Sequence, residues 1–169
     1  MPEPPSDFRI ETLRPQHNRE AFSCGVQALD DYLHRQARQD AEKKAAVVFV
    51  LTADGHTIAG YYTLSQFSVE LSAMPHEIAK QMPKYPDVPA TLLGRLAVAL
   101  SFRGKRLGER LLMDALERAL QGSRQIASTG VALDAKDADT AAFYKRYNFI
   151  ELAGSRLFLP MRSIEKMFA

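Results

Sequence analysis

The chain has 169 residues, 46% of them hydrophobic and 25% charged, and its formal net charge at pH 7 is +2. This size and mixture predict one ordinary globular domain, and no apolar run comes near the ~20 residues that a transmembrane helix needs. The acidic, proline-rich start, MPEPPSDF, does not resemble a signal peptide, and a single cysteine, Cys24, excludes an intramolecular disulfide, so we expect a cytoplasmic protein without membrane contact.

Positive charge gathers in the second part of the chain. Residues 1–94 hold 9 Lys and Arg against 12 Asp and Glu, a net charge of −3, whereas residues 95–169 hold 13 against 8, a net charge of +5. Three explanations remain open: the phosphates of a cofactor, an RNA substrate, or a solvated surface with no partner. The four histidines are scattered, and no Cys/His cluster predicts a metal site.

The first half of the chain predicts strands and helices after a disordered tail at residues 1–7. The apolar face of its first helix consists of Val26, Leu29, Leu33 and Ala37. Ser23 or Cys24-Gly25 would begin that helix, and Asp54-Gly55 is typical of a hairpin turn. The predicted elements are a strand at 8–13, a helix at 22–41, strands at 46–52 and 57–65 (with an extension to 71) and a short helix at 74–82.

The second half predicts a strand, a basic loop and a helix, followed by further strands. Asp137 or Asp139 would cap the later helix, and Asn148 would end it in the left-handed conformation. The predicted elements are a strand at 91–98, a helix at 107–121 that Gly122 stops, a strand at 130–135, a helix at 140–147 and strands at 149–152 and 157–161. This order indicates an α/β (α+β) layer arrangement with a mixed, mostly antiparallel sheet.

The loop between the central strand and its helix carries the strongest chemical signal. It reads Arg103-Gly104-Lys105-Arg106-Leu107-Gly108, and an amphipathic helix follows at once. A helix N-terminus presents unpaired N–H groups and the positive end of the helix dipole. Fed by a glycine-bearing loop, it makes an anion site, most often for phosphate.

This loop resembles motif A of the GNAT family of N-acetyltransferases, which reads Gln/Arg-x-x-Gly-x-Gly/Ala and cradles the pyrophosphate of acetyl-coenzyme A. Arg103 and Gly108 match its first and last positions, whereas Arg106 replaces a glycine, which is tolerable if φ stays negative there. The resemblance implies the GNAT fold, with helices on both faces of the sheet. It also implies that the cofactor acetyl-coenzyme A contacts Leu96, Ala97, Val98, Arg103, Gly104, Lys105, Arg106, Leu107, Gly108 and Glu109.

Residues 133–149, LDAKDADTAAFYKRYNF, resemble motif B of the same family through Phe143-Tyr144 and Asn148-Phe149. In the family this tyrosine protonates the departing coenzyme A thiolate, so the resemblance makes Tyr144 the general acid. A phenol with a pKa of ~10 can give a proton to a thiolate of similar basicity while staying neutral at pH 7. The alternative is that Tyr144 is only a half-buried aromatic residue of the helix.

The acceptor must be an uncharged amine, and the strands at 46–52 and 57–65 offer no clear Glu or His as a general base. An α-amine titrates near ~8 and a lysine near ~10.4. An α-amine beside an ester carbonyl should titrate lower still, so the missing base favours an aminoacyl ester over lysine.

Three further stretches, at residues 22–33, 60–65 and 93–98, resemble one GNAT subgroup, the toxins of bacterial type II toxin–antitoxin pairs. With both motifs, the resemblance covers about residues 8–162. It implies acetylation of the α-amine of aminoacyl-tRNA, which blocks translation, and a ribbon-helix-helix antitoxin through which alone the complex binds operator DNA. It also implies a homodimer. Charge selects the candidate tRNA contacts: Arg35, Arg38, Lys43, Lys44, Arg95 and Lys145.

Two other functions stay open. The first is a GNAT enzyme that acetylates a small amine or a protein N-terminus and has no toxin role. The second is a coenzyme A-binding fold without activity, kept for its partner, although the intact Tyr144 argues against it.

Overall fold

The computed structural model describes residues 7–169, so of the predicted tail at residues 1–7 only Asp7 is described. The strands are β1 (Arg9–Thr12), β2 (Val47–Thr52), β3 (Gly60–Glu70), β4 (Asp87–Val98), β5 (Gly130–Asp134), β6 (Ile150–Glu151) and β7 (Arg156–Pro160). Their order in the sheet is β1-β2-β3-β4-β5-β7-β6. The β4–β5 pair is parallel, whereas β1–β2, β2–β3, β5–β7 and β6–β7 are antiparallel. The mixed, mostly antiparallel sheet is therefore confirmed.

The helices depart from the predicted ranges in several places. They are α1 (Gln27–Asp31), the π-helical η1 (Tyr32–Gln36), α2 (Ala37–Glu42), α3 (His76–Ala79), α4 (Leu107–Ser123), α5 (Ala138–Lys145) and α6 (Met161–Met167). The start predicted at residues 23–25 is wrong, because Gly25 has a φ of +88° and the helix begins after Val26. The helix that begins at Leu107 continues through Gly122 to Ser123, so the stop predicted at Gly122 is wrong. The helix predicted at 74–82 is only α3, and α6 was not predicted. No helix among residues 7–169 has the length and apolar character to span a membrane.

The chain divides into two compact units, which we describe separately. Unit 1 holds the described residues up to Leu64 together with Arg95–Ala115, and unit 2 holds Ser65–Gly94 and Leu116–Ala169. Strands β3 and β4 and helix α4 each contribute one part to either unit.

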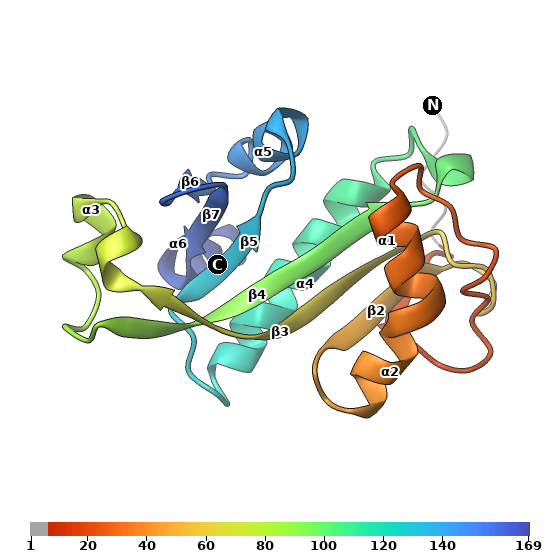
Figure 1. Cartoon of the computed structure of the whole chain (residues 1–169), viewed down its shortest axis with the longest axis horizontal. Helices are drawn as coiled ribbons and strands as arrows, with labels where there is room; N and C mark the ends of the chain where they lie inside the picture. The colour runs from red at the N-terminus through yellow and green to blue at the C-terminus, as the bar shows by residue number, and fades with distance from the viewer. Residues whose placement is uncertain (1–6) are drawn as a thin grey trace. The chain divides into compact units, whose positions relative to one another are not determined.

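In unit 1, helices cover both faces of the strands (Figure 1). Tyr61 and Tyr62 are fully buried neighbours in β3, so their side chains point to opposite faces. The Tyr61 hydroxyl donates to the Leu29 carbonyl in α1 at 2.7 Å, whereas the Tyr62 hydroxyl donates to Asp114 in α4 at 2.5 Å. These two bonds place α1 and α4 against opposite faces of β3, in line with the expected helices on both faces of the sheet.

In unit 2, α5 and α6 flank the strands β5, β6 and β7 (Figure 1). Asp137 caps α5 as predicted, because its carboxylate accepts the Thr140 N–H at 2.7 Å, and Asn148 follows the helix with a φ of +74°. Helix α6 packs with its fully buried Ile164, and the Met161 N–H donates to the Thr129 carbonyl at 2.8 Å. The core of this unit contains Val69, Met74, Val88, Ala90, Ala132, Leu152 and Phe158.

Candidate active site

The basic loop predicted to bind phosphate lies in unit 1, between the 3₁₀ turn η3 (Leu100–Phe102) and α4. Within residues 7–169, the backbone N–H groups of residues 104–108 donate no hydrogen bond. The Arg110 N–H already donates to the Arg106 carbonyl, so the helical ladder starts there. Unengaged amides before a 17-residue helix, with three exposed basic side chains beside them, are suited to a pyrophosphate.

Arg106 takes an unusual backbone conformation immediately before α4. Its φ is +58°, so the condition of a negative φ set out from the sequence is not met. A non-glycine residue in the left-handed region carries a cost of roughly 1–2 kcal/mol, because Cβ approaches the carbonyl oxygen. The chain thus keeps the backbone shape that glycine would adopt freely and accepts this cost at an exposed residue.

Arg103 is bound within unit 1 by its side chain. Its Nη2 donates to the Cys24 carbonyl at 2.7 Å, and the Cys24 N–H donates to the buried Asp30 carboxylate at 2.8 Å. Cys24 itself is buried, and loss of hydration raises the pKa of its thiol, which suits a structural residue.

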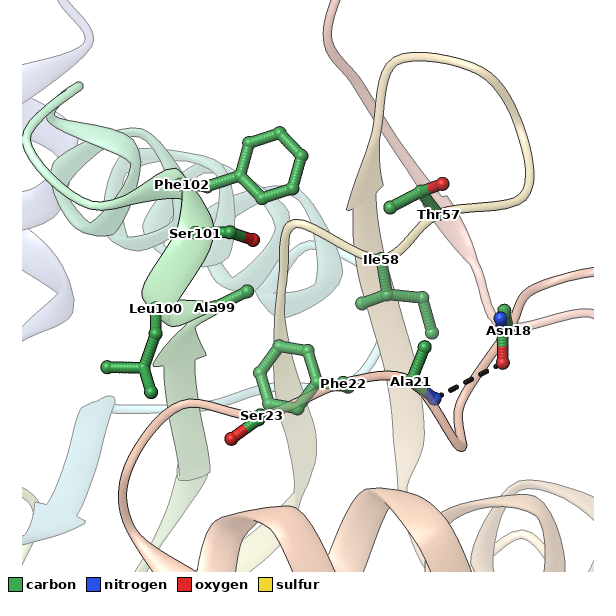
Figure 2. A pocket seen from close by; sticks show the side chains of 10 residues that line it. All are labelled: Asn18, Ala21, Phe22, Ser23, Thr57, Ile58, Ala99, Leu100, Ser101 and Phe102. Carbon is green, nitrogen blue, oxygen red and sulfur yellow. Dashed lines mark hydrogen bonds between the residues drawn. The ribbon is translucent and has the colours of Figure 1, made fainter.

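A pocket of about 220 Å³ lies beside this loop, within unit 1. Figure 2 shows Leu100, Ser101 and Phe102 on one wall and Thr57 and Ile58 on the other. The remaining lining residues are Asn18, Ala21, Phe22, Ser23 and Ala99. The lining combines apolar side chains such as Phe22, Ile58 and Phe102 with the hydroxyl groups of Ser23, Thr57 and Ser101.

Arg95 lies over the ring of Tyr32, with its guanidinium carbon 3.6 Å from the ring centroid. Tyr32 stacks in turn on Tyr61 at 6.3 Å between ring centroids and donates its hydroxyl to Asp40 at 2.8 Å. Within the described part of the chain, Arg95 makes no ion pair, so its N–H edges can still bind an anion. The sequence selected Arg95 by charge alone, and nothing in its pattern pointed to the stack.

The other predicted tRNA contacts have different surroundings. In α2, Arg38 pairs with Glu42 at 2.9 Å. Arg35 in η1, and Lys43 and Lys44 just after α2, are exposed and make no ion pair with residues 7–169. Lys145, in unit 2, pairs with Glu151.

The three residues predicted to contact the pantetheine arm lie at the end of β4. Ala97 is 6% exposed, and Leu96 and Val98 are half-buried. The residue pairs between β4 and β5 are Thr91↔Val131 and Leu92↔Ala132, which precede these three residues in β4.

Tyr144 lies on α5 in unit 2, with its ring against Phe143 and Phe149 at centroid distances of 5.0 and 5.5 Å. Burial raises the pKa of Tyr144, so the phenol stays protonated at neutral pH. The Tyr144 hydroxyl has no hydrogen-bond partner among residues 7–169. Every fully buried side-chain oxygen or nitrogen in that part of the chain does have a partner, so the Tyr144 hydroxyl is not one of the fully buried atoms. The hydroxyl therefore retains solvent-accessible surface, and its proton is available to a ligand.

The sequence analysis assigned no role to Asp30, Tyr32 and Asp40, which hold the site residues. Asp30 and Tyr32 lie in the stretch at residues 22–33 that resembles the toxin subgroup, and this resemblance was the signal that marked them. No group of three or more His, Cys, Asp or Glu that could hold a metal ion occurs among residues 7–169.

A mixed sheet whose long helix follows a basic loop with unengaged amides is the arrangement expected of a protein that binds a phosphate-bearing cofactor, such as an acyl-coenzyme A transferase. Residues 44–151 match the family described as an acetyltransferase (GNAT) domain. The chain belongs to the GNAT family of acetyltransferases.

Within this family, the chain is similar to three proteins or complexes of toxins. A tRNA-acetylating toxin of Mycobacterium tuberculosis is 34% identical over 129 residues, which are 76% of this chain and 76% of the relative. The structure of the AtaT toxin with acetyl-methionyl-tRNAfMet has a TM-score of 0.88 and 29% identity, and covers 96% of this chain and 99% of AtaT. A tyrosine-to-phenylalanine mutant of AtaT, bound to acetyl-CoA and the C-terminus of the antitoxin AtaR, has a TM-score of 0.83 and 26% identity over 97% of this chain and 99% of the other.

Proposed function

We propose that the chain transfers an acetyl group from acetyl-coenzyme A to the α-amine of an aminoacyl-tRNA and so blocks translation as a toxin. The observation that carries the proposal is the open, basic phosphate loop before α4 in a chain of the GNAT family. The similarity to a tRNA-acetylating toxin and to AtaT supports the choice of acceptor.

The amides of residues 104–108 and the side chains of Lys105 and Arg106 would hold the pyrophosphate, with Arg103 and Glu109 at the ends of the loop. The backbone of Leu96, Ala97 and Val98 would bind the pantetheine arm as an added strand does. Acetyl-coenzyme A supplies an activated thioester.

In the reaction, the amine nitrogen forms a bond to the acetyl carbon while the carbon–sulfur bond breaks. Tyr144 would donate its proton to the leaving sulfur, and the proton lost by the amine passes to solvent. Burial raises the pKa of Tyr144, so the phenol is protonated at neutral pH and holds a proton for the thiolate as the carbon–sulfur bond breaks. Solvent would then return a proton to Tyr144.

The acceptor side would be the basic face formed by Arg35, Arg38, Lys43 and Lys44, together with Arg95. Stacking on Tyr32 fixes the guanidinium plane of Arg95 before substrate arrives, so less conformational entropy is lost on binding a phosphate. Lys145 would join after leaving Glu151.

The remaining parts of the proposal concern assembly. We infer a single acetyltransferase domain over residues 8–169, a homodimer in the cytoplasm, and a ribbon-helix-helix antitoxin through which alone the toxin reaches operator DNA. The antitoxin-bound AtaT structure supports an antitoxin partner of some kind.

The test is transfer of labelled acetyl from acetyl-coenzyme A to a total charged tRNA pool, compared with the same pool after deacylation. Label only on the charged pool is the expected result. Label on neither pool, while the protein binds acetyl-coenzyme A, would refute the aminoacyl acceptor and would favour a small amine or a protein N-terminus. The same assay with Tyr144→Phe tests the role of Tyr144 as general acid. Its matched control is Tyr85→Phe, at a tyrosine that is 63% exposed.

A further inference from the structure

Both backbone polar groups of Cys24 are held by charged side chains from other parts of unit 1. The Asp30 carboxylate accepts its N–H at 2.8 Å, and the Arg103 guanidinium donates to its carbonyl at 2.7 Å. Arg103 lies 79 positions further along the chain, at the start of the phosphate loop. The Asp30–Cys24–Arg103 bridge therefore joins the entry of the first helix to the loop that would hold the cofactor.

The two ends of the bridge have different exposure. Asp30 is only 8% exposed, so its carboxylate needs the N–H that it accepts. Arg103 is exposed, and a guanidinium carries five N–H donors, of which Cys24 uses one. Arg103 can thus hold Cys24 and still present donors to a phosphate.

The local backbone is shaped for this contact. Gly25 has a φ of +88°, and a Cβ there would lie 3.4 Å from Leu100 Cδ2 and 3.7 Å from Arg103 Nη2. The Leu100 N–H also donates to the Ser23 carbonyl at 2.8 Å. Two hydrogen bonds therefore join residues 23–24 to residues 100–103, so a displacement of one segment strains or breaks its bonds to the other.

We propose that Asp30 is a positioning residue that acts through the Cys24 backbone on Arg103 and so couples acetyl-coenzyme A binding to the order of residues 22–26. The inference rests on the proposed function, because it takes the loop at 103–108 as the cofactor site. A cofactor that fixes Arg103 stabilises residues 22–26, and by linkage an ordered 22–26 segment strengthens cofactor binding.

The experiment compares acetyl-coenzyme A binding by the wild type, Asp30→Ala, Asp30→Asn and the control Asp31→Ala, using calorimetry at a temperature where circular dichroism shows each to be folded. Asp31 is the adjacent carboxylate, which accepts from Gln27 on the helix surface at 2.7 Å. Loss of a charge-assisted hydrogen bond predicts about a tenfold higher Kd for Asp30→Ala. Asp30→Asn, which keeps an oxygen acceptor, should recover most of the affinity, and Asp31→Ala should match the wild type.

Two further readouts separate positioning from a purely structural role. Acetyl-coenzyme A should slow amide hydrogen exchange in residues 22–26 of the wild type but not of Asp30→Ala. The effects of Asp30→Ala and Arg103→Ala on Kd should also be non-additive, although their side chains bind different atoms of Cys24. A lowered melting temperature with an unchanged Kd, or strictly additive effects, would overturn the proposal. If Kd responds as expected but charged tRNA is not acetylated, only the proposed acceptor fails; if the wild type binds no acetyl-coenzyme A, both fail.

Discussion

The left-handed backbone of Arg106 allows charge and backbone shape to be tested separately in the phosphate loop. Arg106→Ala and Arg106→Gly remove the same exposed cation, but only glycine relieves the strain of a φ of +58°. Relief contributes roughly 1–2 kcal/mol, and the greater freedom of glycine in the unfolded chain offsets about 0.5–1 kcal/mol of it. Arg106→Gly should therefore be more stable than Arg106→Ala by about 0.5–1 kcal/mol, the reverse of the order at ordinary positions.

The assay is urea unfolding of both variants, supported by melting temperatures that should differ by about 2 °C for a chain of this size. If the amides provide most of the binding, Arg106→Gly should keep an acetyl-coenzyme A Kd within a few-fold of the wild type. A more stable Arg106→Ala would refute the strain argument. Loss of binding in both variants would show that the Arg106 charge, and not the loop backbone, holds the phosphates.

Three other predictions concern catalysis, the acceptor and pH. Tyr144→Phe should lower kcat by about a hundredfold or more and leave the acetyl-coenzyme A Kd unchanged, whereas equal kcat values in rapid-quench assays would remove Tyr144 from the chemistry. Arg95→Lys keeps the charge but loses the planar stack on Tyr32, so the KM for charged tRNA should rise several-fold at constant cofactor affinity; an unchanged KM would argue against the stack. Hydrogen bonds from His17 and Arg9 lower the pKa of Glu11 in the folded protein. The ionised Glu11 carboxylate therefore adds to the free energy of unfolding above the unfolded-state pKa of ~4.3, and this stabilisation is lost as the pH falls through the lower folded-state pKa. The urea midpoints of the wild type and Glu11→Gln should differ above about pH 5 and converge in acid, and a constant difference would contradict the linkage.

Local chemistry made much of the fold predictable. The apolar run, basic loop and amphipathic helix at residues 91–121 correspond to β4, the loop and α4, because each element is specified by nearby residues. The cap at Asp137 and the left-handed Asn148 follow from side-chain and backbone preferences within a few positions. Helix α6 was missed because its short sequence, MRSIEKM, has one fully buried apolar residue and too little periodicity.

The supports of the candidate site depend on contacts between distant positions, which sequence patterns do not contain. Tyr32 lies in the stretch that resembles the toxin subgroup, but no sequence pattern indicated that it carries the Arg95 guanidinium from β4. The sequence predicted Arg103 as a contact to the cofactor phosphates. Its hydrogen bond to the Cys24 carbonyl joins residues 79 positions apart and is visible only in the folded chain. The sequence set a negative φ at Arg106 as a condition, and the observed φ of +58° does not meet it; Arg usually prefers a negative φ, so the residue type gave no indication of this conformation.

The π-helical turn at Tyr32–Gln36 has a consequence for how insertions and deletions act on this protein. A π turn is an α-helical turn that has taken in one extra residue. Deleting one of residues 33–36 would restore the α-helix and leave the later side chains near their present faces, so Asp40 would still accept from the Tyr32 hydroxyl. Deleting one residue of α2 beyond the turn would instead rotate every later side chain of the helix by roughly 100° about its axis. The π turn is therefore the place in this helix where a relative can lose a residue and keep Arg38 on the same face.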